Sequence, residues 1–304
     1  MLRNRLPREV RRGFTLIELL VVIAIIAVLV GLTSAAVLRV LVKGPEIQAQ
    51  SEIQQLAAAI SAFKQEFNVK TMPSRIVLYE DMLMYNSDNS TLAQDSRAYL
   101  GMMFGRRIGK TGVPATEDKI DWNNDGTIQA GAAGRYELTG EQCLVFFLGG
   151  AQNATSPLGV QGFSTSPTNP MQAGGTRRGP FFDFKSNRLR PGANGFFVYV
   201  DPFPARNGRQ SQPYVYLSDY STNQYRADST LVAPYRTNGP TGDFLNKGSF
   251  QIICAGADHV FGNPNTYTAT GGQSFINPNP PPHDGDGRDD FANFSRGRLG
   301  APLE

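Results

Sequence analysis

An apolar run near the N-terminus constrains this chain more than any other feature. It begins at Phe14, contains one charged residue, Glu18, and then has no charge over the 20 residues from Leu19 to Leu38. As an α-helix this segment would be about 30 Å long, which is enough to cross the hydrocarbon core of a bilayer. A carboxylate in such a helix costs roughly 2.5–3.5 kcal/mol at the bilayer centre and less near the interface. Glu18 therefore needs a partner or a function.

A basic segment of 13 residues precedes the run. It contains one acid, Glu9, and five arginines: Arg3, Arg5, Arg8, Arg11 and Arg12. Because positive flanks stay in the cytoplasm, the C-terminal bulk of the chain is expected on the other side of the membrane. The whole chain carries a net charge of +3, and loss of the basic segment would leave 24 basic and 25 acidic side chains, or −1. The sequence pI of 8.8 is thus no evidence for nucleic-acid binding, and no nucleic-acid partner is expected.

The segment Gly13-Phe14-Thr15-Leu16-Ile17-Glu18 resembles the processing site of type IV prepilins and type II secretion pseudopilins. This resemblance implies that a prepilin peptidase cuts between Gly13 and Phe14 and that Phe14 is then N-methylated. It also implies that Glu18 pairs with a neighbouring subunit during assembly. The alternatives are an ordinary signal anchor and a secretory signal peptide. A secretory peptide has an apolar core of about 7–15 residues followed by a small-residue cleavage site, and this run is longer.

A second apolar pattern follows the membrane-length run. Between Glu46 and Asn68 the apolar residues recur at spacings of 3, 4, 3 and 4, at Ile53, Leu56, Ile60, Phe63 and Phe67. This spacing predicts an amphipathic helix with one apolar stripe. The sequence leaves open whether Gly44-Pro45 interrupts the helix, because proline fits a first helical turn but kinks a helix interior. The resemblance implies an α+β, pilin-like fold, in which a long N-terminal helix packs on a small antiparallel sheet with long loop insertions.

The remaining chain is rich in glycine (32) and proline (20), with 18% charged residues, which favours short strands and long loops over a helical bundle. Strands are predicted at 76–79, 196–200, 213–217 and 250–254, and a short helix at 93–104. The segment 140–148 suits a buried helix or a strand equally, and 162–179 is predicted to be an exposed insertion. A hairpin is predicted to join 196–200 to 213–217. The predicted divisions are a leader (1–13), a transmembrane helix (14–42), an amphipathic helix (43–68), a variable insertion (69–190) and a sheet with an acidic loop (191–304).

The C-terminal third resembles the major pseudopilin of type II secretion. The resemblance rests on Asp201-Pro202-Phe203, on Pro213-Tyr214-Val215-Tyr216, on Ala255-Gly256-Ala257-Asp258 and on the acidic stretch 284–294. Phe203 stands where that family has Trp, and His259 where it has Gly. Related pseudopilins hold calcium in a C-terminal loop of this kind. We therefore predict a calcium site formed by some of Asp284, Asp286, Asp289 and Asp290, with Asp258 as a further contributor; a solvated acidic turn is an equal alternative.

A second carboxylate-rich segment, Asp121-Trp122-Asn123-Asn124-Asp125-Gly126, resembles the first half of an EF-hand loop. It has acceptors at positions 1, 3 and 5 and glycine at position 6. Position 12 is Ala132, where that loop needs a bidentate glutamate. An Asx-rich turn is therefore the favoured interpretation over a cation site.

Little in the sequence points to catalysis. Two cysteines, Cys143 and Cys254, lie in apolar runs, where two buried hydrophobes are slightly favoured over a disulfide. With His259 and His283 at scattered positions, they do not have zinc-site spacing. No nucleophile-elbow, phosphate-loop or zincin motif is present. We expect a structural subunit in the inner membrane, with a periplasmic C-terminal domain, that contacts lipid, other subunits and an assembly platform. The alternative is a binding module for adhesion or DNA uptake that uses the insertion at 69–190.

Overall fold

Helix α1 (Leu16–Glu66) is the longest element of the chain and contains both predicted helical segments. The computed structural model describes residues 15–114, 116–153, 157–206, 208–220, 224–226, 228–237, 242–262, 289–295 and 298–299. The chain divides into two compact units, residues 1–45 and 46–304. The backbone of α1 is continuous through Pro45, so Gly44-Pro45 does not end the helix.

The first unit exposes an apolar helical surface. The 19-residue span Leu16–Ser34 is long and apolar enough to cross a membrane, and none of it is buried. In a soluble protein, a helix that is apolar on all sides is usually buried in the core. The span Leu16–Ser34 is not buried in this way. This helical surface needs lipid or another apolar partner to cover it.

In the second unit, α1 packs through the predicted stripe. Its five apolar residues are all buried, with exposed fractions of 5% or less. The ring centroid of Phe63 is 5.5 Å from that of Phe147, and the centroid of Phe67 is 5.8 Å from that of Phe163. The amphipathic prediction for this part of the helix is therefore confirmed.

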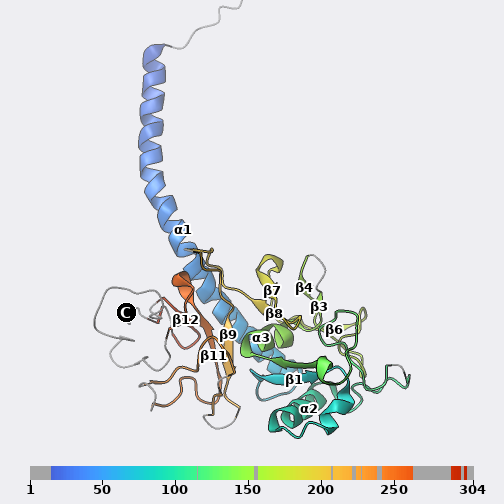
Figure 1. Ribbon diagram of the computed structural model, residues 1–304. Helices are drawn as coiled ribbons and strands as arrows, with labels where there is room; N and C mark the ends of the chain where they lie inside the picture. The colour runs from blue at the N-terminus through green and yellow to red at the C-terminus, as the bar shows by residue number, and fades with distance from the viewer. Residues whose placement is uncertain are drawn as a thin grey trace, which may run out of the picture. The chain divides into compact units, whose positions relative to one another are not determined.

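A two-stranded ladder and a helix lie next along the chain (Figure 1). Strand β1 (Ile76–Tyr79) has the predicted bounds and pairs antiparallel with β2 (Arg135–Leu138), with Ile76 opposite Leu138. A short 3-10 helix, η1 (Met82–Asn86), follows β1, and η2 (Gly131–Gly134) precedes β2. Helix α2 (Thr91–Phe104) contacts β1 and begins after Ser90, whose hydroxyl accepts a hydrogen bond from the N–H of Ala93. The predicted helix at 93–104 is confirmed.

The segment for which the sequence allowed either a helix or a strand forms a helix, α3 (Gly140–Gly149). Thr139 and Gln142 form a capping box at its start, which explains why a helix begins there. Each of its ten residues is buried, and the helix contacts β8 and β9. A helix that is buried on all sides has no exposed polar face. The spacing of its apolar residues therefore does not distinguish it from a strand.

The main sheet is three-stranded, in the order β12-β11-β9, and antiparallel. Its strands are β9 (Val215–Ser218), β11 (Phe250–Cys254) and β12 (Phe291–Ala292). Side chains alternate between two apolar clusters, so that Tyr216 and Ile252 belong to one and Val215 and Ile253 to the other. The sheet is thus covered on both faces, and the predicted strands at 213–217 and 250–254 are confirmed.

Three more two-stranded ladders are short. They pair β3 (Gln152–Asn153) with β4 (Gly159–Val160), β5 (Phe163–Ser164) with β6 (Arg177–Arg178), and β7 (Leu189–Pro191) with β8 (Phe197–Tyr199). The expectation that 162–179 is simply exposed is wrong, because Phe163 and Met171 are buried. The predicted hairpin is only partly present. Strand β8 pairs with β7 over its length and meets the segment before β9 through a bridge between Val200 and Pro213.

The chain has a long N-terminal apolar helix followed by small antiparallel sheets, which is the α+β combination of a pilin-like fold. The region 69–190 contributes β1, α2, β2 and α3 to the same unit and core as the C-terminal strands.

Candidate functional site

The N-terminal end of α1 is closed by a capping box. The carboxylate of Glu18 accepts hydrogen bonds from the N–H and the hydroxyl of Thr15, both at 2.8 Å, and the Thr15 hydroxyl accepts from the N–H of Glu18 at 3.3 Å. Thr and Glu three residues apart satisfy the otherwise unpaired N–H groups of a first helical turn. This capping role was not predicted from the sequence, although the Thr-x-x-Glu spacing is typical of a capping box. Gly13 and Phe14 lie outside the described residues.

Glu18 therefore has a local partner in a single chain, and it remains exposed. A carboxylate held at a helix N-terminus also interacts favourably with the helix dipole. These contacts lower the cost of a charge at the edge of the apolar span. The same carboxylate is placed to meet a cationic group supplied from outside the chain.

Three of the predicted cation ligands come together in the second unit. The Oδ2 atom of Asp289 accepts from the N–H of Asp258 at 2.8 Å, which places the loop after β11 beside the start of β12. The Oδ2 atom of Asp290 accepts from the Tyr235 hydroxyl and the Gly262 N–H, both at 3.0 Å. Asp284 and Asp286 lie outside the described residues.

Asp290 is buried in this cluster, Asp258 and Asp289 are half-buried, and the three like charges are electrostatically unfavourable. Burial, with smaller contributions from the charges of Asp289 and Asp258, raises the pKa of Asp290 to about 8. Burial, followed by the charge of Asp258, also raises the pKa of Asp289. Oδ1 of Asp290 has no hydrogen-bond partner among the described residues. Within that part of the chain, no three His, Cys, Asp or Glu side chains converge closely enough to hold a metal by themselves.

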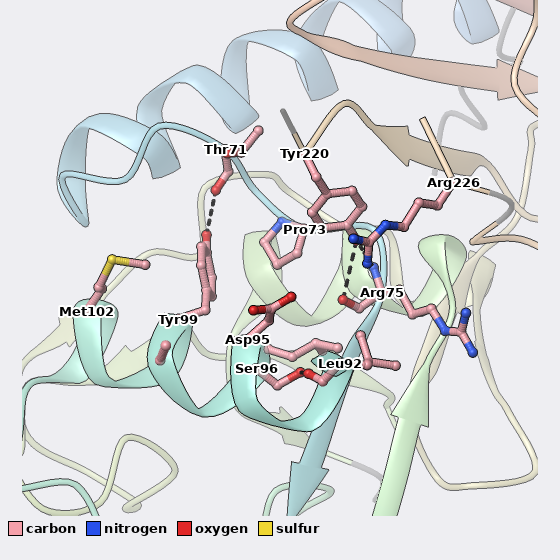
Figure 2. A pocket seen from close by; sticks show the side chains of 12 residues that line it. Thr71, Pro73, Arg75, Leu92, Asp95, Ser96, Tyr99, Met102, Tyr220 and Arg226 are labelled. Atoms are coloured by element: carbon pink, nitrogen blue, oxygen red, sulfur yellow. Dashed lines mark hydrogen bonds between the residues drawn. The ribbon is translucent and has the colours of Figure 1, made fainter. Parts of the chain in front are cut away.

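A cavity of about 360 Å³ lies between α2 and the segment that precedes β1 (Figure 2). Tyr220 forms one wall, where its hydroxyl accepts from the N–H of Arg75 at 2.7 Å and the Arg226 guanidinium lies 5.1 Å from its ring centroid. The Tyr99 hydroxyl donates to the carbonyl of Thr71 at 2.8 Å. The lining combines two guanidinium groups with the carboxylate of Asp95, several hydroxyl groups and apolar side chains, and it contains no cysteine or histidine. It offers a surface for binding and no aligned nucleophile.

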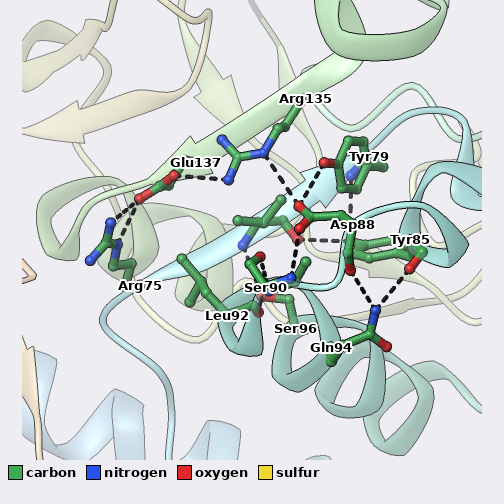
Figure 3. A network of polar contacts seen from close by, with 12 residues as sticks. Arg75, Tyr79, Tyr85, Asp88, Ser90, Leu92, Gln94, Ser96, Arg135 and Glu137 are labelled. Carbon is green, nitrogen blue, oxygen red and sulfur yellow. Dashed lines mark hydrogen bonds and ion pairs between the residues drawn. The ribbon is translucent and has the colours of Figure 1, made fainter.

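A polar network ties β1 and β2 to the loop before α2 (Figure 3). Glu137 accepts from Arg75 Nε at 2.7 Å and pairs with Arg135 at 3.1 Å, while the Tyr79 hydroxyl donates to Asp88 at 2.8 Å. Hydrogen bonds from Ser90 and then from Tyr79 lower the pKa of Asp88 to about 2. Every member of this network has a partner that stabilises its charged or polar form, so its role is structural.

The cysteines and the described histidine do not form a reactive centre. Cys143 and Cys254 are free and completely buried, and burial raises the pKa of both thiols. The favoured interpretation as two buried hydrophobes agrees with this arrangement. His259 is buried with its Nε2 atom 3.0 Å from the carbonyl oxygen of Pro204. His283 lies outside the described residues.

Comparison with known proteins adds one finding. Residues 10–34 match the family model of the prokaryotic N-terminal methylation motif. No curated protein and no solved structure matches the chain significantly. The match covers the predicted cleavage position, the capping box and most of the exposed apolar span. The chain therefore carries a prokaryotic N-terminal methylation motif on an apolar helix, which is consistent with a type IV pilin-like prepilin.

Proposed function

We propose that this chain is a structural subunit of a type II secretion pseudopilus or a type IV pilus-like filament. The observation that carries the proposal is the N-terminal methylation motif at residues 10–34, on a helix whose apolar span is entirely exposed. Lipid covers such a surface before assembly, and the helices of neighbouring subunits cover it afterwards. In this proposal a prepilin peptidase removes residues 1–13, and the C-terminal unit lies in the periplasm, anchored by one helix in the inner membrane.

Glu18 sets the register of assembly in this scheme. An unpaired carboxylate in a nearly apolar helix bundle is strongly unfavourable. The subunit is therefore expected to assemble in the position where a cationic group contacts the Glu18 carboxylate. The N-methylated ammonium of Phe14 in a neighbouring subunit supplies that cation. Assembly thus replaces or supplements the contact between Glu18 and Thr15 that the single chain already makes.

Three variants separate the assembly role of Glu18 from its capping role. Glu18→Gln keeps an acceptor for the Thr15 N–H, because Gln also serves in a capping box, but it removes the charge. Glu18→Ala removes both the cap and the charge. Thr15→Ala removes the capping hydroxyl and keeps the charge, and it is the matched control.

Each variant would be co-expressed with a prepilin peptidase and an assembly system, and the amount in sheared filaments measured against the membrane pool. We expect Glu18→Gln and Glu18→Ala to insert and lose residues 1–13 but to enter filaments poorly, while Thr15→Ala enters them well. Normal incorporation of Glu18→Gln would exclude charge pairing as the role of Glu18. Mass spectrometry of the mature chain checks the cut after Gly13 and the methyl group on Phe14.

The second candidate, a binding module displayed by the helix, has one favourable observation, the cavity beside α2. The region 69–190 that would carry the binding supplies core elements rather than a separate module. A structural subunit is therefore the better-supported function. Specific ligand binding that Arg226→Ala abolishes, with filament assembly intact, would favour the alternative.

We also propose calcium binding at the C-terminal acidic cluster of Asp258, Asp289 and Asp290, with Asp284 and Asp286 as further ligands. The support is the contact between the Asp289 carboxylate and the backbone N–H of Asp258, and the Oδ1 atom of buried Asp290, which has no hydrogen-bond partner among the described residues. Calorimetric titration of the detergent-solubilised chain tests it against Asp289→Asn. Unchanged calcium binding in that variant would remove Asp289 from the site.

A further inference from the structure

The two ends of the loop from Asp121 to Gly134 are held together by backbone hydrogen bonds to a single residue, Glu80. The N–H of Ile120, just before the loop, donates to the Glu80 carbonyl at 2.8 Å, and the Glu80 N–H donates to the carbonyl of Gly134 at 3.0 Å. The indole of Trp122 is fully buried and donates to the carbonyl of Tyr79 at 2.9 Å. The loop is thus fixed to the end of β1 at three points.

The first half of this loop has the local geometry of a cation-binding turn. Oδ2 of Asp121 accepts from the N–H of Gly126 at 2.8 Å, and Gly126 has a φ of 87°, in the left-handed region that favours glycine. The N–H of Asp125 lies 3.2 Å from both Oδ1 of Asp121 and Oδ1 of Asn123. Residues 124–130 are exposed, so an ion has access from solvent.

The side chain of Glu80 reaches into the loop from the core side. Glu80 has an exposed fraction of 0%, and its Oε2 atom accepts from the N–H of Gln129 at 2.5 Å. Its Oε1 atom has no hydrogen-bond partner of normal geometry in the described part of the chain, and the nearby Tyr136 hydroxyl interacts with the carboxylate group and lowers its pKa. An unpartnered carboxylate oxygen at full burial is costly, and a bound cation would offset that cost.

The acids of the loop are close enough for their charges to affect Glu80. Burial raises the pKa of Glu80, and the charges of Asp121 and Asp125 raise it further. Burial and the same carboxylates raise the pKa of Tyr136 to about 12. Three acids therefore crowd one small region in which the described residues place no basic side chain against Glu80.

We propose that Glu80 takes the place of the glutamate missing at position 12 and that this loop binds a calcium-type divalent cation. The remaining ligands are the side-chain oxygens at positions 1, 3 and 5 and the carbonyl oxygen at position 7, which belong to Asp121, Asn123, Asp125 and Thr127. Calcium takes six to eight oxygens, typically with amide and backbone carbonyl oxygens among them. The Asp and Glu side chains alone do not converge on one point, so the site depends on these added oxygens and on an inward rotation of Asp125.

Trp122 makes the test specific to this loop. It is the only tryptophan in the chain and occupies position 2 of the loop, so its emission reports this site and not the C-terminal acidic cluster. The detergent-solubilised full chain would be stripped with a chelator, and terbium luminescence excited through tryptophan would then be measured. We expect saturable luminescence that calcium displaces at concentrations below about 1 mM.

Two variants and one control complete the experiment. Glu80→Gln keeps the shape and the acceptor for Gln129, and Asp125→Asn changes an exposed side chain, so the native fold is expected to persist in at least one of them. We expect each to weaken calcium competition at least roughly tenfold, or about 1.4 kcal/mol. Asp289→Asn, in the C-terminal cluster, should leave the tryptophan-excited signal unchanged. No saturable signal up to millimolar ion, or unchanged affinity in folded Glu80→Gln, would overturn the proposal.

Discussion

Glu52 and Arg188 form a buried ion pair between α1 and the segment that leads into β7. Two guanidinium nitrogens of Arg188 contact the two carboxylate oxygens of Glu52 at 2.6 and 2.7 Å, and the side chains are only 9% and 11% exposed. The hydroxyl of Tyr214 donates to the same carboxylate at 2.8 Å. Helical periodicity places Glu52 beside the apolar stripe but gives no sign of a partner 136 residues away. Such a pair follows from tertiary structure and not from local pattern.

Replacement of one member of this pair leaves the other charge buried without an opposite charge. We expect Arg188→Met to lower the free energy of unfolding by about 3–5 kcal/mol, and the double variant Glu52→Leu/Arg188→Met to lose less. Lys247→Ala, which breaks an exposed pair with Asp243, is the control and should change it by less than about 1 kcal/mol. Guanidinium unfolding of the detergent-solubilised chain measures all three. A loss in Arg188→Met no larger than that of the control would refute the estimate.

Asp201 is expected to make the stability of the fold depend on pH. Its side chain accepts from the N–H groups of Phe203 and Gln212, both at 3.1 Å, and burial raises its pKa to about 7. An unfolded aspartate has a pKa of about 3.9, so the native state binds the additional proton between about pH 4 and 7. The contribution of Asp201 to stability is therefore greatest at low pH and decreases as the pH rises through this window.

Asp201→Asn removes this titration while other acids, such as Asp290, continue to titrate. We expect the difference in melting temperature, wild type minus Asp201→Asn, to fall steadily from pH 4 to pH 8. Thermal unfolding followed by circular dichroism at each pH measures it. A difference that stays constant or rises with pH would contradict the raised pKa.

At the scale of elements, the patterns that could be predicted were a helical apolar stripe and short runs of β-branched and aromatic residues between turn residues. The stripe of α1 and the strands β1 and β11 have apolar residues bounded by polar or turn residues, and their bounds agree closely with the structure. Helix α3 is buried on all sides, so its sequence alone left helix and strand open. The ladder of β5 and β6 escaped prediction because each strand has two residues, too few for any periodicity. At the candidate sites, the capping role of Thr15 could be predicted from its spacing to Glu18. The contact of Glu80 with the loop after Ile120 could not, because it depends on β-strand pairing.

Close packing between α3 and β9 predicts the effect of a single methyl group. A Cβ atom on Gly140 would lie 1.9 Å from the carbonyl oxygen of Tyr216, so the helix or the strand would have to move. We expect Gly140→Ala to destabilise the fold by about 1–3 kcal/mol or more. The matched control is Gly101→Ala in α2, where nothing lies within 4 Å and alanine should stabilise the helix by about 0.5–1 kcal/mol. Chemical denaturation should therefore show changes of opposite sign, and equal signs would contradict the packing argument.

At the scale of the whole molecule, the division into two units has a thermodynamic consequence. The buried apolar core begins at Ala49, and residues 15–34 are exposed along their whole length. The apolar span therefore contributes to membrane or filament contacts and little to the folding of residues 46–304. The membrane motif could be identified from sequence because its signal is local. The arrangement of the second unit could not, because its core joins segments from α1, 69–190 and the C-terminal third.

A fragment of residues 44–304 tests this independence. Beginning at Gly44 places Pro45 in the first helical turn, where its fixed φ and missing N–H are tolerated, and it keeps the ion pair between Glu46 and Arg298. We expect the fragment to be soluble and to unfold cooperatively, with a free energy of unfolding within about 1 kcal/mol of that of the full chain in detergent, because it retains the buried apolar core, which begins at Ala49. Guanidinium unfolding followed by tryptophan emission measures this through Trp122, which is buried in the retained core. A non-cooperative transition in the fragment would mean that the exposed helix stabilises the second unit, which the absence of burial along Leu16–Ser34 argues against.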